Sequence, residues 1–138
     1  MDTTLLGTLQ TGLPVLLLQF LTTLALLALG IGCYTALTPF REWRLIRDGN
    51  IAAGLILAGA IVALAIPLAA TLATSAFTLD IVLWGFVALV LQLLTFTVVA
   101  LLMRGLRAMI EAGNVAAACM LVGIQIAVAL LNAGAMAG

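Results

Sequence analysis

The sequence predicts an all-α integral membrane protein whose chain crosses the bilayer four times. Of its 138 residues, 66% are apolar and only 7% are charged, whereas about 25% of the residues of an ordinary soluble domain are charged. A soluble domain of this size could not bury so much apolar side-chain surface. The apolar residues fall in long uncharged runs, and every basic residue lies between runs. These two patterns predict the helices and their threading through the membrane.

Four uncharged runs are each long enough to form a transmembrane helix. They cover residues 13–37, 51–73, 81–103 and 115–136. A bilayer core needs about 20 apolar residues per helix, and none of the runs alternates polar and apolar residues as a barrel strand does. The segment before the first run carries Asp2 and no basic residue. We therefore expect no signal peptide, and the first run should stay in the protein as a helix.

The arginines predict the orientation of these helices. All five basic residues are arginines, and they lie in the loops after the first and third runs: Arg41, Arg44, Arg47, Arg104 and Arg107. Because short basic loops stay in the cytoplasm, both loops are predicted to be cytoplasmic. Both termini and the short turn before Asp80 should then be extracytoplasmic. The compactness of the chain suggests a multi-pass protein of a bacterial inner membrane.

An internal repeat divides the chain into two units. A shift of 64 residues aligns residues 45–65 with 109–129, and nine of the 21 aligned positions are identical. Each unit consists of a helix, a loop with the motif Ile-x-x-Gly-Asn and a second helix that opens with Ala-Ala. Both loops face the same side, so we expect a parallel repeat with its pseudo-axis along the membrane normal. We predict one membrane domain over residues 1–138, with units at about 13–73 and 80–136.

Each arginine-bearing loop is predicted to contain a short amphipathic helix at the membrane interface. In the first loop, Pro39 suits the first helical position, with Thr38 as the N-cap. The arginines recur every three residues on one face, and Trp43 and Ile46 lie on another, which puts the Trp43 indole at headgroup level. A glycine ends this helix, and the asparagine after it caps the next one. Residues 104–114 repeat this arrangement.

Small residues are spaced for close contact between helices. They form three groups: Ala28, Gly32 and Ala36; Gly59 and Ala63; and Gly123 and Ala127. We expect each group to pack closely against a neighbouring helix.

The composition excludes several kinds of catalytic site. The chain contains no His and no Lys, and its only serine is Ser75. A Ser-His-Asp or Cys-His nucleophile and a His-based metal site are therefore impossible within one chain. The formal net charge is zero, so there is no broad basic face for nucleic acid. We expect no enzymatic activity, no cofactor and no disulfide from Cys33 and Cys119, which lie in apolar runs and are expected to be buried.

Few residues are candidates for a path or a ligand site. They are Gln92, Gln125 and Asn132 within the spans, and Asn50, Asn114, Arg47, Glu42 and Glu111 in the loops. Gln92 and Asn132 are either interhelical hydrogen-bonding residues or pore-lining residues. None of the polar residues within the spans is charged, although a proton relay or gating charge would require a charged one.

The loop candidates also have two interpretations each. Asn50 and Asn114 are either helix N-caps or part of an anion site at two helix N-termini, with Arg47 close to one of them. Glu42 and Glu111 are either solvated partners of nearby arginines or coupling carboxylates. The arginines should act as topology and headgroup anchors.

Many positions within residues 34–136 follow the pattern of one family. In the first half they are Thr38, Pro39, Glu42, Trp43, Leu45, Ile46, Asn50, Ala52, Ala53, Pro67 and Leu68; in the second they are Asp80, Trp84, Gly85, Gln92, Ile110, Asn114, Ala116, Ala117, Asn132, Ala133 and Met136. The sequence thus resembles the YjfL-like family of short bacterial inner-membrane proteins, a domain of unknown function. The resemblance implies four helices, two repeated modules and no settled activity. The family often ends in Asn-Ala-Ala-Cys-Met; residues 132–136 lack that cysteine, so no role of it carries over.

Two classes of function fit these observations. The first is a transporter or channel for a small polar or charged solute. Because four helices hardly enclose a path, this function requires a homo-oligomer, most simply a C2 dimer. The alternative is a non-transporting adaptor or scaffold that docks partners through its arginine-bearing loops; the family resemblance implies that it would act in an envelope-stress or related system. Besides the lipid bilayer and a second copy, the expected partner is an anionic lipid or a small solute.

Overall fold

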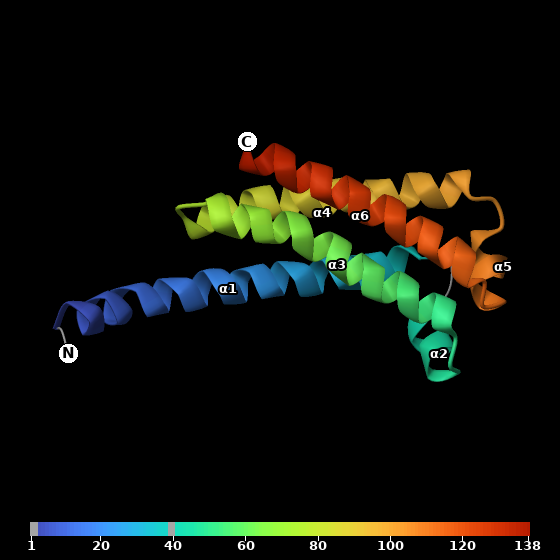
Figure 1. Ribbon diagram of the computed structural model, residues 1–138, viewed down its shortest axis with the longest axis horizontal. Helices are drawn as coiled ribbons and strands as arrows, with labels where there is room; N and C mark the ends of the chain where they lie inside the picture. Colours follow the sequence, from blue (N-terminus) through green and yellow to red (C-terminus); the bar gives the residue numbers. More distant parts are fainter. Residues whose placement is uncertain (1–2, 39–40) are drawn as a thin grey trace.

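The computed structural model describes residues 3–38 and 41–138, which form six α-helices (Figure 1). Four are long and apolar enough to cross a membrane: α1 (Thr3–Leu37), α3 (Ile51–Thr74), α4 (Thr78–Leu102) and α6 (Val115–Ala137). Two short helices, α2 (Glu42–Arg47) and α5 (Leu106–Glu111), lie in the arginine-bearing loops. The all-α fold with four candidate membrane spans is thereby confirmed. The limits of the spans agree closely with the prediction except in α1, which begins at Thr3 rather than near residue 13.

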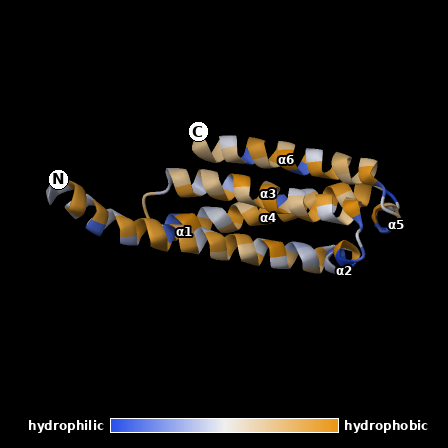
Figure 2. Cartoon of the chain, turned by 60° about the horizontal axis from the view of Figure 1, so that its bottom comes forward, coloured by the Kyte–Doolittle hydropathy of each residue, from blue (hydrophilic) through white to orange (hydrophobic). Residues whose placement is uncertain are grey.

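Successive long helices are antiparallel, and α3 lies at the centre of the bundle. Helix α3 packs against α1, α4 and α6, and α6 packs mainly along α3 (Figure 1). Helices α2 and α5 lie at one end of the bundle, which we call the Arg end, and hydrophilic residues gather there (Figure 2). The turn between α3 and α4 and the C-terminus lie at the opposite end, which we call the Asp80 end. The two arginine-bearing loops thus share one end of the molecule.

Helix α1 is much longer than the bilayer core is thick. Its 35 residues extend over about 52 Å at about 1.5 Å per residue, against a core of about 30 Å. Only Leu26, Gly30 and Tyr34 are buried in it, and its N-terminal part projects beyond the rest of the bundle (Figure 1). The apolar side chains of that part, such as Leu9 and Leu16, are exposed in the single chain. They require lipid or another protein as their surroundings.

The two asparagines after the short helices are N-caps, as the sequence predicts. The Oδ1 atoms of Asn50 and Asn114 accept hydrogen bonds from the backbone N–H groups three residues later, at 3.0 and 3.1 Å. The preceding residues, Gly49 and Gly113, have φ angles of 82° and 80°, a left-handed conformation that favours glycine at the end of a helix. The same local structure therefore occurs at both motifs. The proposed limits of the two repeat units stay predictions.

The expected start of the first short helix was wrong. Helix α2 begins at Glu42, and the residue at its N-cap position makes no side-chain capping bond. Thr38 does not cap α2, because its backbone N–H still bonds to the end of α1, at the Tyr34 carbonyl (3.0 Å). Its hydroxyl donates instead to the Glu42 carboxylate, with Oγ1 and Oε2 2.9 Å apart. Pro39 lies outside the described residues.

One of the three small-residue groups makes the expected close contact within the chain. Gly59 lies against the Val122 side chain of α6, where an added Cβ would approach its atoms to 2.5 Å, and Ala63 is fully buried. Gly32 and Gly123 have open space around them, and the alanines of their groups are exposed. For these two groups the expectation was wrong for the single chain, because α1 and α6 turn other faces toward α3. Cys33 and Cys119 are free cysteines on exposed faces, so their expected burial was wrong for the single chain.

Candidate functional site

Five polar side chains lie inside the bundle between the Arg end and the Asp80 end; four are buried, and Asn132 is partly exposed. In this order they are Glu42 on α2, Tyr34 on α1, Gln125 on α6, Gln92 on α4 and Asn132 on α6, and we call them the polar line. The first four are at most 4% exposed. Tyr34 was not among the residues selected from the sequence. The other four were, and within the described residues a hydrogen bond joins two of them, Gln92 and Gln125.

The middle of the polar line joins α4 to α6. The Nε2 atom of Gln92 donates a hydrogen bond to the backbone carbonyl of Gln125 across 2.8 Å, which confirms Gln92 as an interhelical hydrogen-bonding residue. The Tyr34 ring packs edge-on against Phe96 with ring centroids 4.7 Å apart, and its hydroxyl is near the side chains of Gln125 and Glu42. Aromatic packing therefore holds the phenol near Gln125 and Glu42.

Every residue of the polar line has a buried polar atom without a hydrogen-bond partner. These atoms are Glu42 Oε1, Tyr34 Oη, Gln125 Oε1, Gln92 Oε1 and Asn132 Nδ2, and within the described residues no other buried side-chain nitrogen or oxygen lacks a partner. A buried polar atom left without a partner costs about 1–3 kcal/mol, and lipid supplies no alternative partner. The five atoms are therefore candidates for contacts with water or with a solute.

Glu42 differs from the sequence prediction. It is 1% exposed, and α2 packs against α3 with Glu42, Leu45 and Ile46 on its inner side while Trp43 is 57% exposed. Burial raises the pKa of Glu42 to about 7; the hydrogen bonds from Thr38 and from its own backbone N–H oppose this rise only in part. Its interpretation as a solvated partner of arginine was therefore wrong. The positions i, i+3 and i+4 could have revealed it, since they form one helical face.

Glu111 behaves as the sequence predicts. Its Oε1 lies 3.0 Å from Nε of Arg107 in an exposed ion pair four residues apart. Such a pair contributes little to stability. Among the described residues, no three Cys, Asp or Glu side chains gather as a metal site would require.

The two motif asparagines have different surroundings. The Nδ2 atom of Asn50 donates to the Ile110 carbonyl at the end of α5 (2.8 Å) and also contacts that of Glu111 (3.4 Å). The side chain of Asn114 is exposed and makes only its capping bond among the described residues. Arg47 lies at the surface of the Arg end. The bond of Asn50 ties the second unit's short helix to the first unit's long helix, and Asn114 makes no matching bond in return.

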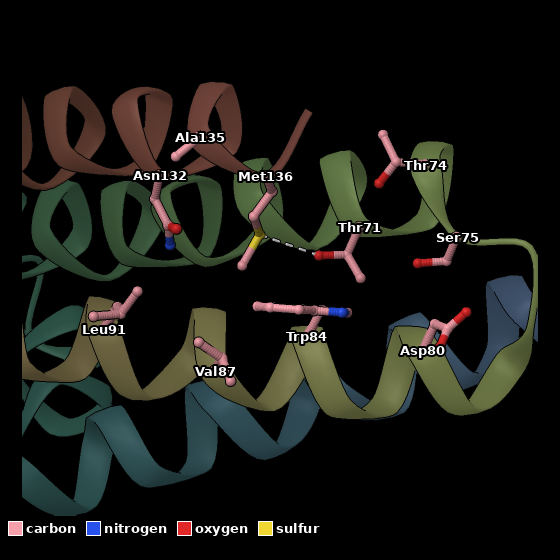
Figure 3. Close-up of a pocket in the computed structure, with 10 residues that line it drawn as sticks. All are labelled: Thr71, Thr74, Ser75, Asp80, Trp84, Val87, Leu91, Asn132, Ala135 and Met136. Carbon is pink, nitrogen blue, oxygen red and sulfur yellow. Dashed lines mark hydrogen bonds between the residues drawn. The ribbon is translucent and has the colours of Figure 1, made fainter. Parts of the chain in front are cut away.

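A cavity lies at each end of the polar line. The cavity at the Arg end, of about 1180 Å³, is lined by Glu42, Glu111, Arg41, Arg44, Arg47 and Arg107, among others. The cavity at the Asp80 end, of about 550 Å³, lies between the ends of α3 and α6 and the start of α4 (Figure 3). Its lining includes Asn132, Asp80 and Trp84. The polar line therefore begins in one cavity and ends in the other.

Comparison with known proteins agrees with this architecture. The model of a domain of unknown function, DUF350, matches residues 8–136. The chain belongs to the DUF350 family. This DUF350 protein is also similar to the UPF0719 inner membrane protein YjfL of Escherichia coli strains K12 and O157:H7. With each it is 36% identical over 103 residues, which are 75% of this chain and 78% of the relative.

The family and the four apolar helices define the general class of the molecule. The expected YjfL-like family is confirmed, and the DUF350 protein is a small multi-pass protein of the inner membrane. No solved structure matches the chain. The family name carries no activity, and the polar line and the two cavities are the features of the molecule that bear on its function.

Proposed function

We propose that this DUF350 protein is a homo-oligomeric transporter or channel for a small polar or charged solute. The observation that carries the proposal is the polar line, with an unpartnered buried atom on each of its five residues. Polar groups inside a membrane protein are expensive, and they commonly mark the pathway of a substrate or ion. A protein that only anchors a partner to the membrane has no need of them.

The two cavities support the same proposal. One opens at each end of the bundle, and Glu42 and Asn132 place the ends of the polar line in them. Between the cavities Tyr34, Gln92 and Gln125 are packed, with at most 4% of each residue exposed. A solute larger than a proton would therefore need helices to move apart. The two-unit architecture of the chain offers such a movement, as in transporters built from repeats.

The proposed function requires more than one copy of the chain. Four helices leave little room for a path, and α1 is packed on one side only, with most of its length exposed. A C2 dimer would cover part of this apolar surface, and C2 is the commonest symmetry of homo-oligomers. The protein would act without a cofactor and without chemical catalysis.

A second candidate function is that of a membrane adaptor in an envelope-stress or related system. The observation that favours it is the outer surface of α2, where Trp43 is 57% exposed. Arg41, Arg44 and Arg47 form no ion pair with any described residue. An aromatic side chain beside free guanidinium groups is a common composition of protein-binding surfaces. Such a surface would work without the polar line.

The two functions are separated by flux through liposomes that contain only this protein. Solid-supported membrane currents would be recorded under gradients of protons, ammonium, potassium and chloride, and light scattering would follow urea and glycerol. We expect at least one probe to cross faster than in empty liposomes, and Gln92→Leu to reduce that flux at least tenfold. Gln10→Leu, the same change on the exposed part of α1, is the matched control. Absence of flux for every probe would reject transport, and full flux in Gln92→Leu would reject the polar line as the path of the solute.

A further inference from the structure

The cavity at the Asp80 end has the composition of a binding site for a small cation. Among the described residues, Asp80 is the only charged residue in its lining, and none of the lining residues is basic. All five arginines belong to the loops at the opposite end. Helices α3 and α6 both end here, and the C-terminus of a helix carries a partial negative charge. Asp80 and these two helix ends favour a positive charge in the cavity, while the N-terminus of α4, which also lies here, opposes them.

Asp80 interacts with the start of its own helix, but its carboxylate oxygens are left without a hydrogen-bond donor from the described residues. It lies in the first turn of α4, where a carboxylate interacts favourably with the helix N-terminus. Its side chain accepts no hydrogen bond and forms no ion pair within the described residues. Ser75 and Thr74 line the same part of the cavity, and Figure 3 shows the Ser75 hydroxyl near Asp80. A carboxylate next to hydroxyl oxygens is a suitable set of acceptors for the N–H groups of an ammonium.

Trp84 supplies an aromatic surface between the two polar sides of the cavity. Figure 3 shows its indole lying across the cavity between Asp80 and Asn132, beneath Met136. The indole is the aromatic ring that attracts cations most strongly, by about 0.5–2 kcal/mol. An inorganic cation is coordinated by oxygen atoms and needs no aromatic ring. The ring therefore favours an organic ammonium.

Asn132 indicates which chemical group the ligand carries at its other end. Its Nδ2 atom is buried, has no partner in the protein, and its side chain points into the cavity (Figure 3). An amide N–H is a donor and requires an oxygen acceptor. A ligand that satisfies both sides carries an ammonium group and an oxygen atom a short distance apart.

We propose that this cavity binds an ethanolamine-type group, with its ammonium at Asp80 and Trp84 and its oxygen at Asn132. The group is either a free amino alcohol or the headgroup of a phosphatidylethanolamine molecule. The proposal deepens the proposed function, because a solute bound here stands at one end of the polar line. Binding itself is an equilibrium property that is measured without flux.

The test is a fluorescence titration of the protein in nanodiscs that contain only phosphatidylglycerol. A Trp43→Phe background leaves Trp84 as the only indole. Ethanolamine should change its fluorescence saturably and raise the thermal unfolding temperature, and ethylene glycol, which lacks the ammonium, should do neither. Asp80→Asn should weaken the affinity for ethanolamine at least tenfold. Asp48→Asn, the same change at the Arg end, should leave it unaltered.

Two further arms complete the experiment. Asn132→Ala, which removes the donor and keeps Asp80, should also weaken ethanolamine binding. In nanodiscs of phosphatidylethanolamine, a headgroup ligand would change the Trp84 fluorescence before any addition and block the titration, whereas a free ligand would give the same titration as in phosphatidylglycerol. The proposal would be overturned if ethanolamine gave no saturable change in phosphatidylglycerol discs and the Trp84 fluorescence did not differ between the two lipids. Equal affinities for ethanolamine in Asp80→Asn and Asp48→Asn would also overturn it. Binding without flux would reject transport alone, and flux without binding would reject this site alone.

Discussion

The stability of the protein should fall as the pH rises from about 4.5 to about 7, and Glu42→Gln should abolish this fall. The reason is that the Glu42 carboxyl is 1% exposed, with one oxygen bonded to Thr38 and the other without a partner. Burial disfavours the charged form and raises the pKa of Glu42 from 4.5 to about 7. Glutamine has the size of the protonated acid and keeps a carbonyl oxygen for Thr38, but it never carries the charge.

The size and sign of the effect follow from the two pKa values. Between pH 4.5 and about 7 the folded protein keeps a proton that the unfolded chain has released, so the free energy of unfolding decreases with rising pH. The stabilisation is complete below 4.5 and lost above about 7. At ~1.4 kcal/mol per pH unit across this interval, the total is ~3 kcal/mol. At pH 8 the Glu42→Gln variant should therefore be more stable than the wild type, and at pH 4.5 the two should be nearly equal.

The assay is thermal or denaturant unfolding in one detergent over a series of pH values from 4.5 to 8. Glu111→Gln is the control, because the Glu111 carboxylate is exposed and paired with Arg107; it should follow the wild-type pH dependence. Parallel curves for the wild type and Glu42→Gln over the whole range would refute the reasoning. So would a Glu42→Gln variant that is less stable than the wild type at pH 8.

Four other predictions concern packing, caps, topology and assembly. Gly59→Ala should destabilise the protein by about 1–3 kcal/mol in an unfolding assay, because the new Cβ would approach Val122 of α6 to 2.5 Å. Gly123→Ala, at the matching position of the second unit, has open space around it and should be nearly neutral in the same assay. Asn50→Asp and Asn114→Asp both keep the capping acceptor, but only the first loses a 2.8 Å bond to α5; the first should therefore cost about 1 kcal/mol more. A reporter fused after Gly138 should be active only if it functions in the periplasm, and activity of a cytoplasm-specific reporter there would reverse the topology. Native mass measurement in mild detergent should give a dimer, and a monomer at all concentrations in both detergent and nanodiscs would contradict the oligomer.

The architecture could be predicted because its causes are local. A run of apolar residues long enough to cross the bilayer has to be helical, and a Gly-Asn pair ends one helix and caps the next by contacts within a few residues. Asn50 and Asn114 illustrate this, since both capping bonds are present. The early start of α1 escaped prediction because Gly7 and Gly12 lie in a segment of mixed polarity, where propensity alone gives a weak signal.

The candidate site was only partly predictable because its geometry depends on tertiary packing. Gln92 and Gln125 were recognisable as polar residues in apolar helices, but their meeting depends on how α4 lies against α6. Tyr34 was missed because a tyrosine near the end of a span is usually an interfacial residue. The sequence does not reveal that α1 turns this ring toward Phe96. The cavity at the Asp80 end combines residues from three helix ends, and no spacing in the sequence connects them.

The two units of the repeat differ most where the sequence makes them most alike. Asn50 binds across to α5, and Gly59 is packed against α6. Their counterparts 64 residues later, Asn114 and Gly123, are exposed and have no such contacts in the single chain. A symmetric site formed by both asparagines would need the amide N–H groups of both to be free for the ligand. The N–H group of Asn50 already donates to the Ile110 carbonyl, so the two asparagines do not form such a site. The sequence repeat therefore supplies two similar caps, while the candidate path is built from residues that the repeat does not duplicate: Gln92 and Gln125 share one hydrogen bond between α4 and α6. If the protein transports a solute, its path should accordingly be asymmetric within each chain, and symmetry should arise only between copies.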